Sequence, residues 1–315
     1  MRIVIAGGSG FLGRALTDTL VAAGHHVQIL SRRPSQGPRS VATGTAPQVD
    51  HINWAPDGRS GAWASACAGA DIVVNLAGES IAAERWTAAR KARLRSSRVL
   101  ATRSLVRFIA ESGQPPSAFV SASAIGFYGD RGGEALAENA GPGRDFLAEL
   151  AVEWEQEALA AQSERTRVVL LRTGIVLDPH EGALAKMVTP FRLFAGGPFG
   201  SGRQFMSWIH RDDWVSLARW AAEMPGLNGP LNLTAPNPVT NGDFARALGR
   251  ALHRPAVVPA PGFALTLMLG EMAGPLLLYS QRVMPAKALE SGFRFAHPAL
   301  DEALANLLST GEPRG

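Results

Sequence analysis

The chain has 315 residues, 46% of them hydrophobic, with one cysteine and a formal net charge of +4. This length and apolar content allow a large buried core, so we expect one composite domain or two closely packed domains. The single cysteine, Cys67, excludes an internal disulfide and a metal site made of several cysteines. The small excess of positive charge does not indicate a nucleic-acid partner, and we expect none.

The first strand pattern, residues 3–6, leads directly into three glycines and then into a helical pattern over residues 11–23. In a dinucleotide-binding turn the first glycine permits the tight turn, the second lets the backbone approach a pyrophosphate, and the third lets helix and strand pack closely. The positive end of the helix dipole then faces the phosphates. The pattern therefore predicts dinucleotide contacts at Gly7, Gly10, Phe11, Leu12 and Gly13. A tight turn without a ligand remains the alternative.

Further apolar runs alternate with helical patterns along the first half of the chain. Strand-like runs occur at 27–30, 51–54, 72–76, 118–121 and 168–172, and helical patterns at 62–68, 84–112 and 145–162. This alternation predicts an α/β fold, a doubly wound parallel sheet (Rossmann fold) with a smaller C-terminal substrate-side domain. We assign residues 1–178 to an NADP-binding Rossmann domain, with 205–235 returning to it, and residues 236–315 to the smaller domain.

The second strand pattern ends in Ser31, Arg32 and Arg33. NAD sites usually carry an acidic residue here, roughly 20 residues after the glycines, to bind the ribose hydroxyls. The first acid after this strand is Asp50. A hydroxyl and two guanidinium groups instead suit the additional phosphate of NADP(H), through charge-assisted hydrogen bonds. The sequence therefore predicts NADP as the cofactor, and a solvated arginine pair is the alternative.

Three later stretches have open interpretations. The arginine-rich stretch 90–107 predicts a solvated helix face, unless part of it meets a cofactor phosphate. The glycine-rich stretch 195–202 either covers a substrate or is a plain connector. Segment 262–279 is mostly apolar but contains Glu271 and is interrupted by Gly270, Gly274 and Pro275. It predicts two short buried helices, and we expect no membrane partner.

The apolar run before Gly7 is too short for a signal peptide, so we expect a cytoplasmic protein.

Five motifs follow one another along residues 6–13, 75–78, 121–124 with Tyr128, 171–176 and 208–213. Together they resemble the extended short-chain dehydrogenase/reductases. Glu79, Arg85–Trp86, Ser97–Arg98 and the stretch from Asn241 to Phe293 are similar, more narrowly, to the atypical branch called epimerase family protein, whose C-terminal domain has no assigned role. The resemblance implies further cofactor contacts at Leu76, Ala77, Gly78, Arg98 and Val176.

The catalytic pair of the wider family, Tyr-x-x-x-Lys, is absent. Position +4 is Gly132 after Tyr128 and Val283 after Tyr279, and the resemblance places Phe146 and Leu150 where the pair would stand. Ser123 matches the family's serine, and Tyr128, five residues later, is the nearest phenol. Ser123 and Tyr128 are therefore the candidate catalytic residues. Glu79 and His210 are further candidates for proton transfer. A structural role is the alternative for each of them and for Tyr128, and His210 precedes a helix start.

These observations predict an NADP(H)-binding oxidoreductase or epimerase-like enzyme that acts on a small hydroxyl or carbonyl compound without the Tyr-x-x-x-Lys pair. The alternative is a protein that binds NADP(H) as a signal and catalyses nothing. The histidines show no metal-ligand spacing, so we expect no metal site. The long helical patterns at 84–112 and 145–162 are compatible with a homodimer.

Overall fold

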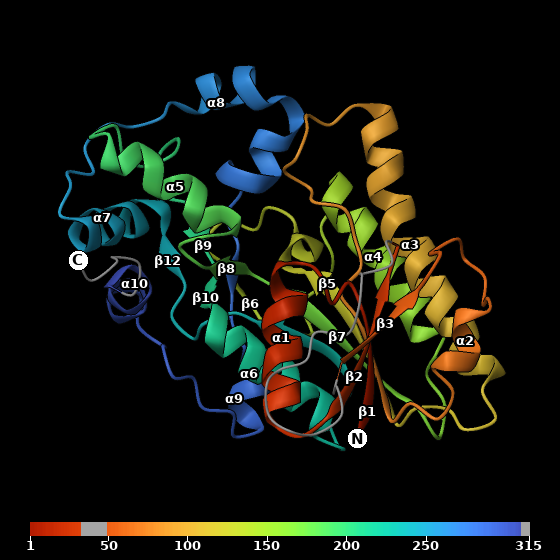
Figure 1. Ribbon diagram of the computed structural model, residues 1–315. Coiled ribbons are helices and arrows are strands. Elements are labelled where there is room, and N and C mark those ends of the chain that lie inside the picture. The colour runs from red at the N-terminus through yellow and green to blue at the C-terminus, as the bar shows by residue number, and fades with distance from the viewer. Residues whose placement is uncertain (33–48, 310–315) are drawn as a thin grey trace.

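The computed structural model describes residues 1–32 and 49–309. Its centre is a seven-stranded sheet with the order β11-β7-β5-β4-β1-β2-β3 (Figure 1). All neighbouring strands in it are parallel. The strands are β1 (Arg2–Ala6), β2 (His26–Ser31), β3 (Val49–Asn53), β4 (Ile72–Asn75), β5 (Ala118–Ala124), β7 (Arg167–Thr173) and β11 (Gly229–Leu233). The expected α/β class with a doubly wound parallel sheet is confirmed.

Helices cover both faces of this sheet. Ile3 and Ile5 of β1 pack in one apolar cluster with α1 (Phe11–Ala22) and α6 (Arg211–Glu223). Val4 and Ala6 point to the other face and pack in a cluster with α2 (Trp63–Ala66) and α3 (Ala88–Glu111). Because successive side chains of a strand alternate between faces, a strand buried on both faces must be apolar throughout, as β1 is.

The strand order reverses direction between β1 and β4. On one side of this point successive strands lead to β3, and on the other side they lead to β11. This arrangement leaves a crevice at the carboxyl ends of the strands, where ligands of doubly wound folds bind. The turn from β1 into α1, the loop after β4, and the ends of β5 and β7 all meet at this edge. The helix α4 (Phe146–Leu159) packs beside α3 and against β5.

A third apolar cluster lies beside the sheet (Figure 1). It joins β8 (Ile175–Leu177), α5 (Gly182–Arg192), β9 (Phe205–Met206), β10 (Trp208–His210), β12 (Val239–Thr240), α7 (Asn241–Leu252) and α10 (Leu300–Ser309). The later C-terminal strand β13 (Arg282–Val283) returns to pair with β6 (Ala135–Leu136), and α9 (Ala286–Glu290) contacts β11. The C-terminal residues therefore border the crevice, and Met272 packs with Leu94 of α3.

The segment expected to form two short buried helices differs from that expectation. It forms α8 (Gly262–Leu269), the short turn η2 (Gly270–Met272) and the π-helical turn η3 (Gly274–Leu278). The helix α8 buries only Leu265, whereas Phe263 is 77% exposed and Leu267 79% exposed. The prediction of burial was wrong for α8, because this helix lies at the rim of the molecule with one side unpacked (Figure 1). Among the described residues, no helix is long and apolar enough to cross a membrane.

Candidate dinucleotide and substrate site

The turn between β1 and α1 has the geometry of a phosphate-binding turn. Gly7 has a φ of +82°, and its carbonyl oxygen accepts a hydrogen bond of 3.0 Å from the Gly10 N–H. A Cβ atom on Gly13 would lie 2.2 Å from that same carbonyl oxygen. Gly7 therefore supplies a left-handed backbone conformation, and Gly13 permits contact between turn and helix.

The first turn of α1 is open to an anion. Gly10 is its N-cap residue, and no side chain among the described residues caps the helix. The N–H groups of Phe11, Leu12 and Gly13 have no carbonyl partner within the helix, since the first three donors of an α-helix never do. Uncapped donors and the positive helix dipole suit a pyrophosphate.

A cavity of about 910 Å³ opens beside this turn. Seven of the residues expected to bind cofactor line it, namely Gly7, Gly10, Ser31, Arg32, Leu76, Ala77 and Gly78. The cavity also contacts Trp54 and Pro56 at the end of β3, which sequence reasoning missed. The indole N–H of Trp54 is buried without a hydrogen-bond partner in the described part of the chain. Arg33 lies outside the described residues.

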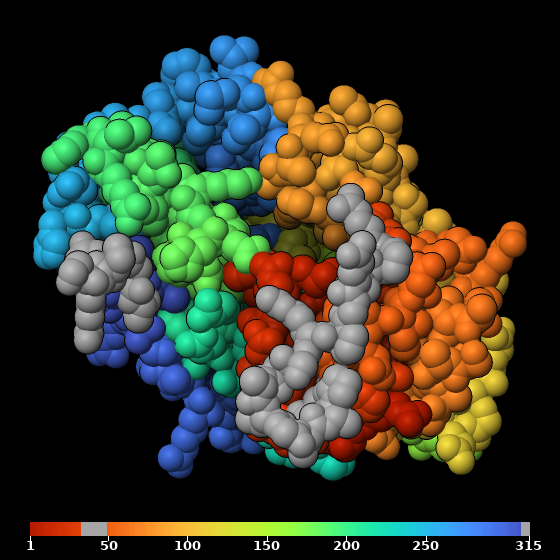
Figure 2. All heavy atoms as spheres, viewed as in Figure 1, coloured from red at the N-terminus to blue at the C-terminus, as the bar shows by residue number. Residues whose placement is uncertain are grey.

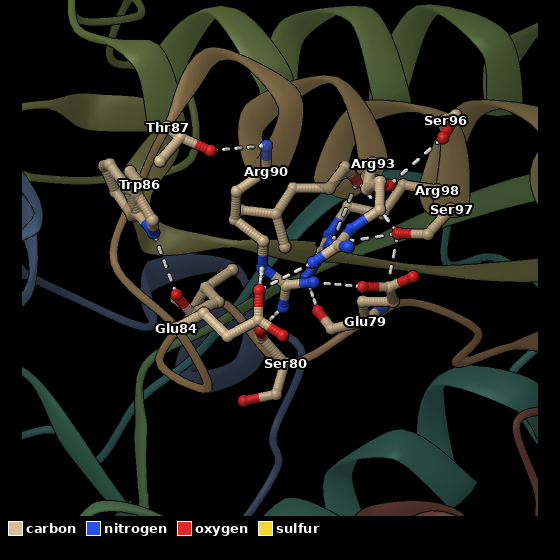
Figure 3. Close-up of polar contacts among 12 residues, drawn as sticks. Glu79, Ser80, Glu84, Trp86, Thr87, Arg90, Arg93, Ser96, Ser97 and Arg98 are labelled. Carbon is tan, nitrogen blue, oxygen red and sulfur yellow. Dashed lines mark hydrogen bonds and ion pairs between the residues drawn. The ribbon is translucent and has the colours of Figure 1, made fainter.

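The loop after β4 is held by two arginines of α3, the buried Arg90 and the partly buried Arg98 (Figure 3). Arg90 forms an ion pair with the Glu79 carboxylate and donates a hydrogen bond of 2.6 Å to the Ser80 carbonyl. Arg98 donates to the carbonyl oxygens of Glu79, at 2.9 Å, and Leu94, at 3.1 Å. These contacts occupy Glu79 in a structural role, the alternative given for it from the sequence.

Arg98 also separates the dinucleotide cavity from a second one. Its guanidinium Cζ lies 3.3 Å from where a Gly78 Cβ would stand, and 5.3 Å from the centre of the Trp154 ring. Burial, and the charge of Arg90, lower the pKa of Arg98 to about 10. Arg98 lines the second cavity, and Gly78 lines the first.

The second cavity has a volume of about 290 Å³. Figure 2 shows the hollow in which it lies, between the glycine turn in red, the loop after β4 in orange and α5 in green. Its walls come from the ends of β5 and β7, from α4 and from the C-terminal region, and include Ser123, Leu147, Leu150, Trp154, Thr173, Gly174, Ile175, Phe199, Leu276 and Tyr279. Ser123 therefore lies at the expected crevice, whereas Val176, expected to contact the cofactor, is buried in β8 and lines neither cavity.

Ser123 belongs to a buried polar network. Its hydroxyl donates a hydrogen bond of 2.6 Å to the Glu155 carboxylate. Arg172 binds that carboxylate with two hydrogen bonds of 2.8 Å each, and both side chains of the ion pair are at most 7% exposed. Burial acts to lower the pKa of Arg172, but the bonds and charge of Glu155 outweigh it and raise that pKa. Sequence reasoning missed Glu155 and Arg172, although a charge in a buried strand and another on an apolar helix face indicate a pair.

Tyr128 is the clearest departure from the sequence expectation. Its side chain is fully buried and is not among the residues that line either cavity. Its hydroxyl donates to the Asn232 side chain, at 2.7 Å, and accepts from Arg172, at 3.0 Å. Burial raises the pKa of this phenol. In this geometry the Tyr128 hydroxyl contacts Arg172 and lines neither cavity, which favours the structural alternative over the expected catalytic role.

His210 also has a structural role. Its Nδ1 accepts a hydrogen bond of 3.1 Å from the Asp212 N–H and thereby caps α6. Its Nε2 lies 3.2 Å from the side-chain oxygen of Asn306. Among the described residues, His210, Asp212 and His297 form the one group that offers three metal-ligand atoms close together. Both ring nitrogens of His210 are engaged, and we propose no metal there.

Comparisons with known proteins agree with this geometry. The NAD dependent epimerase/dehydratase family model matches residues 3–233, and the model of a domain of unknown function, DUF1731, matches residues 260–307. Epimerase family protein YfhF of Bacillus subtilis is 39% identical over 310 residues, which are 98% of each chain.

Two solved structures extend the comparison. The crystal structure of human epimerase family protein SDR39U1 (isoform 2) with NADPH has a TM-score of 0.86 and 33% identity, over 98% of this chain and 99% of that one. The nucleoside-diphosphate sugar epimerase from Corynebacterium glutamicum has a TM-score of 0.77 and 34% identity, over 98% of this chain and 58% of that one. The chain therefore belongs to the NAD dependent epimerase/dehydratase family, in the group of epimerase family proteins that carry a C-terminal DUF1731 region.

Proposed function

We propose that this chain is an NADP(H)-dependent oxidoreductase that acts at a carbon bearing oxygen on a small molecule. The observation that carries the proposal is the position of the 290 Å³ cavity. It lies at the carboxyl ends of β5 and β7, and Arg98 on its wall lies against Gly78 on the wall of the dinucleotide cavity. In doubly wound folds this edge is where a cofactor and its substrate meet.

The chain's own residues suit the phosphorylated cofactor. The open first turn of α1 would hold the pyrophosphate, and Ser31 and Arg32 would hold the 2′-phosphate together with Arg33. No carboxylate stands at the described end of β2 to bind a ribose hydroxyl, as an NAD site prefers. The relative crystallised with NADPH supports the same choice. When bound, the nicotinamide accepts or supplies hydride.

Ser123 would orient the oxygen of the substrate. The Ser123 hydroxyl donates its hydrogen to Glu155, which Arg172 holds in place. The Ser123 oxygen therefore presents lone pairs to the cavity. The hydroxyl of an alcohol substrate, or of the alcohol that a reduced carbonyl becomes, can donate to them. The mostly apolar walls exclude water from this contact and so strengthen it.

A second candidate function is a binding protein that responds to NADP(H) without catalysis. The observation that favours it is the character of α4, where Phe146 and Leu150 pack with Trp86 in an apolar cluster. Neither side chain can move a proton. A cytoplasmic location, a small-molecule substrate and a homodimer remain predictions.

The test combines binding with turnover. We expect purified protein to bind NADPH at least tenfold more tightly than NADH in a fluorescence titration, and to oxidise NADPH with some member of a panel of uncharged aldehydes and ketones. Ser123→Ala should leave NADPH affinity unchanged and lower that turnover. Tight NADPH binding with no turnover on the panel would favour the second function, and equal or tighter NADH binding would contradict the cofactor assignment.

A further inference from the structure

The C-terminal region closes the 290 Å³ cavity with an ionisable side chain. Five residues of the DUF1731 region, 260–307, line it together with Ser123 and residues of α4: Pro275, Leu276, Leu277, Tyr279 and Gln281. We propose that Tyr279, in the DUF1731 region, is the catalytic residue that gives a proton to the carbonyl oxygen of a small uncharged substrate. This inference rests on the proposed reductase function and gives the C-terminal region a part in it.

The Tyr279 hydroxyl is available to a ligand. No described residue forms a hydrogen bond with it, and it is not among the sealed polar atoms that lack a partner. The hydrogens of two other donors on the cavity wall are engaged, because Ser123 donates to Glu155, and Gln281 donates to the carbonyl oxygens of Ile125, at 3.1 Å, and Gly129, at 3.0 Å. A phenol at a mostly apolar wall normally has a partner, and a ligand can supply one.

The backbone before Tyr279 makes room for its ring. Residues Gly274–Leu278 form a π-helical turn, and the Tyr279 N–H closes it with a bond of 2.9 Å to the Gly274 carbonyl. A Cβ on Gly274 would lie 2.9 Å from Cε1 of the Tyr279 ring. A π-helical turn is rare and is found most often at functional sites. Here it places the ring against a glycine.

The residues after Tyr279 fix its position. Ser280 donates its hydroxyl to the Gly132 carbonyl, at 2.5 Å, and its N–H to Asp130, at 3.0 Å. Ser207 donates to the Gln281 carbonyl, at 2.7 Å, and the next two residues form β13 against β6. Tyr279 is therefore held between a π-helical turn and a segment bonded to the sheet domain, which is the support that a reacting group needs.

The cavity wall indicates the class of substrate. Arg98 is its only charged side chain among the described residues, and the Arg98 guanidinium is already bonded to backbone carbonyls and packed on Trp154. The described lining therefore offers no cluster of positively charged side chains that would bind a diphosphate. Apolar walls of this size fit a small aldehyde or ketone that carries one oxygen.

The electrostatics keep the phenol protonated. Burial, and the charges of Asp145, Asp130 and Glu271, raise the pKa of Tyr279. A phenol without a nearby cation is a poor base near neutrality, but it can donate its proton to an oxygen that becomes negative. This environment suits reduction of a carbonyl rather than oxidation of an alcohol.

The proposed step reduces the carbonyl group of the substrate to an alcohol. The carbonyl carbon receives the hydride that the reduced dinucleotide supplies when bound, and the electron pair of the C=O π bond moves to oxygen. That oxygen takes the proton of the Tyr279 hydroxyl as the phenol O–H bond breaks. An alcohol and an oxidised dinucleotide result, and water returns a proton to the phenolate.

The test compares a ketone with its parent hydrocarbon. Binding of 1-indanone and indane is measured by ligand-observed NMR, with and without saturating NADP⁺, so that no hydride is available. One hydrogen bond to the ketone oxygen should make 1-indanone bind about three- to tenfold more tightly than indane. Tyr279→Phe should abolish this preference and leave the affinity for indane unchanged. Tyr128→Phe should retain the preference, because the Tyr128 hydroxyl does not line the cavity.

Each outcome decides the proposal. A ketone preference that survives in Tyr279→Phe, or wild-type protein that binds neither compound, overturns it, and so does binding of UDP-glucose in preference to 1-indanone. Tyr279→Phe should also bind NADPH as the wild type does. Failure of wild-type protein to bind NADPH contradicts the proposed function instead, and the ketone comparison without dinucleotide still tests Tyr279. If turnover of 1-indanone is measurable, the variant should lower kcat about 100-fold or more.

Discussion

The two cavities of this protein are built differently. The dinucleotide cavity is shaped mostly by backbone, with glycines at the β1–α1 turn and at the end of the loop motif after β4. The smaller cavity is shaped by side chains that come from the loop after β4, from α3, α4 and β5, and from residues up to Gln281. A backbone cradle accepts a group common to many cofactors, whereas a wall of side chains decides what is bound beside it.

The largest expected effect is on the free energy of unfolding, through the buried ion pair of Glu155 and Arg172 beside the smaller cavity. Glu155→Gln leaves the Arg172 guanidinium buried without a counter-charge, so we expect a loss of about 3–5 kcal/mol in the free energy of unfolding. Glu153→Gln is the matched control, because Glu153 pairs with Arg95 where both side chains are more than 40% exposed. Its change should stay below about 1 kcal/mol. Chemical denaturation measures both, and equal losses would show that the buried pair does not support the wall.

The backbone cavity was predictable from sequence because its elements are local. Gly7, Gly10 and Gly13 occur within seven residues of one another, between one strand and one helix, so their spacing alone specifies the turn. The same holds for α7, because the amphipathic pattern of residues 241–252 coincides with the helix. The end of β2, with Ser31 and Arg32, reaches the dinucleotide cavity as its position in the motif requires.

The side-chain cavity was not predictable, because its parts lie far apart in the chain. Ser123 and Glu155 are 32 positions apart, and no sequence spacing indicates their bond. Tyr128 follows Ser123 closely, yet the turn η1 (Ile125–Tyr128) directs it away from the cavity, into contact with Asn232. Tyr279 enters from the other end of the chain. Tertiary packing decides such neighbours, and local pattern carries no information about it.

The next effect concerns the backbone cradle. Gly13→Ala would place a Cβ 2.2 Å from the Gly7 carbonyl oxygen, so turn and helix must separate. Overpacking of this kind costs about 1–3 kcal/mol, and we expect NADPH affinity to fall about 10- to 100-fold. Gly113→Ala is the control, since no atom lies within 4 Å of its added Cβ. A fluorescence titration that gives wild-type affinity for Gly13→Ala would contradict the assigned turn.

A smaller effect should distinguish the two dinucleotides. Arg32 lines the cavity at the end of β2 and is exposed, so a 2′-phosphate can reach it. Arg32→Ala should weaken NADPH binding about tenfold, the loss of one charge-assisted hydrogen bond, and should leave NADH binding unchanged. Arg107→Ala is the control, because it removes an exposed arginine of α3 that does not line the cavity. Parallel titrations decide the matter, and equal weakening of both dinucleotides by Arg32→Ala would place this residue elsewhere on the cofactor.

The smallest effect tests whether the C-terminal wall is as finely shaped as the glycine turn. Gly274→Ala would place a Cβ 2.9 Å from the Tyr279 ring, so the ring must shift by a few tenths of an ångström or more. The hydroxyl remains present but is displaced, and we expect the preference for 1-indanone over indane to fall by about threefold, less than its loss in Tyr279→Phe. Gly226→Ala, with open space around its added Cβ, is the control. A preference equal to that of the wild type in Gly274→Ala would mean that the ring tolerates displacement, and that the π-helical turn serves folding rather than the position of the phenol.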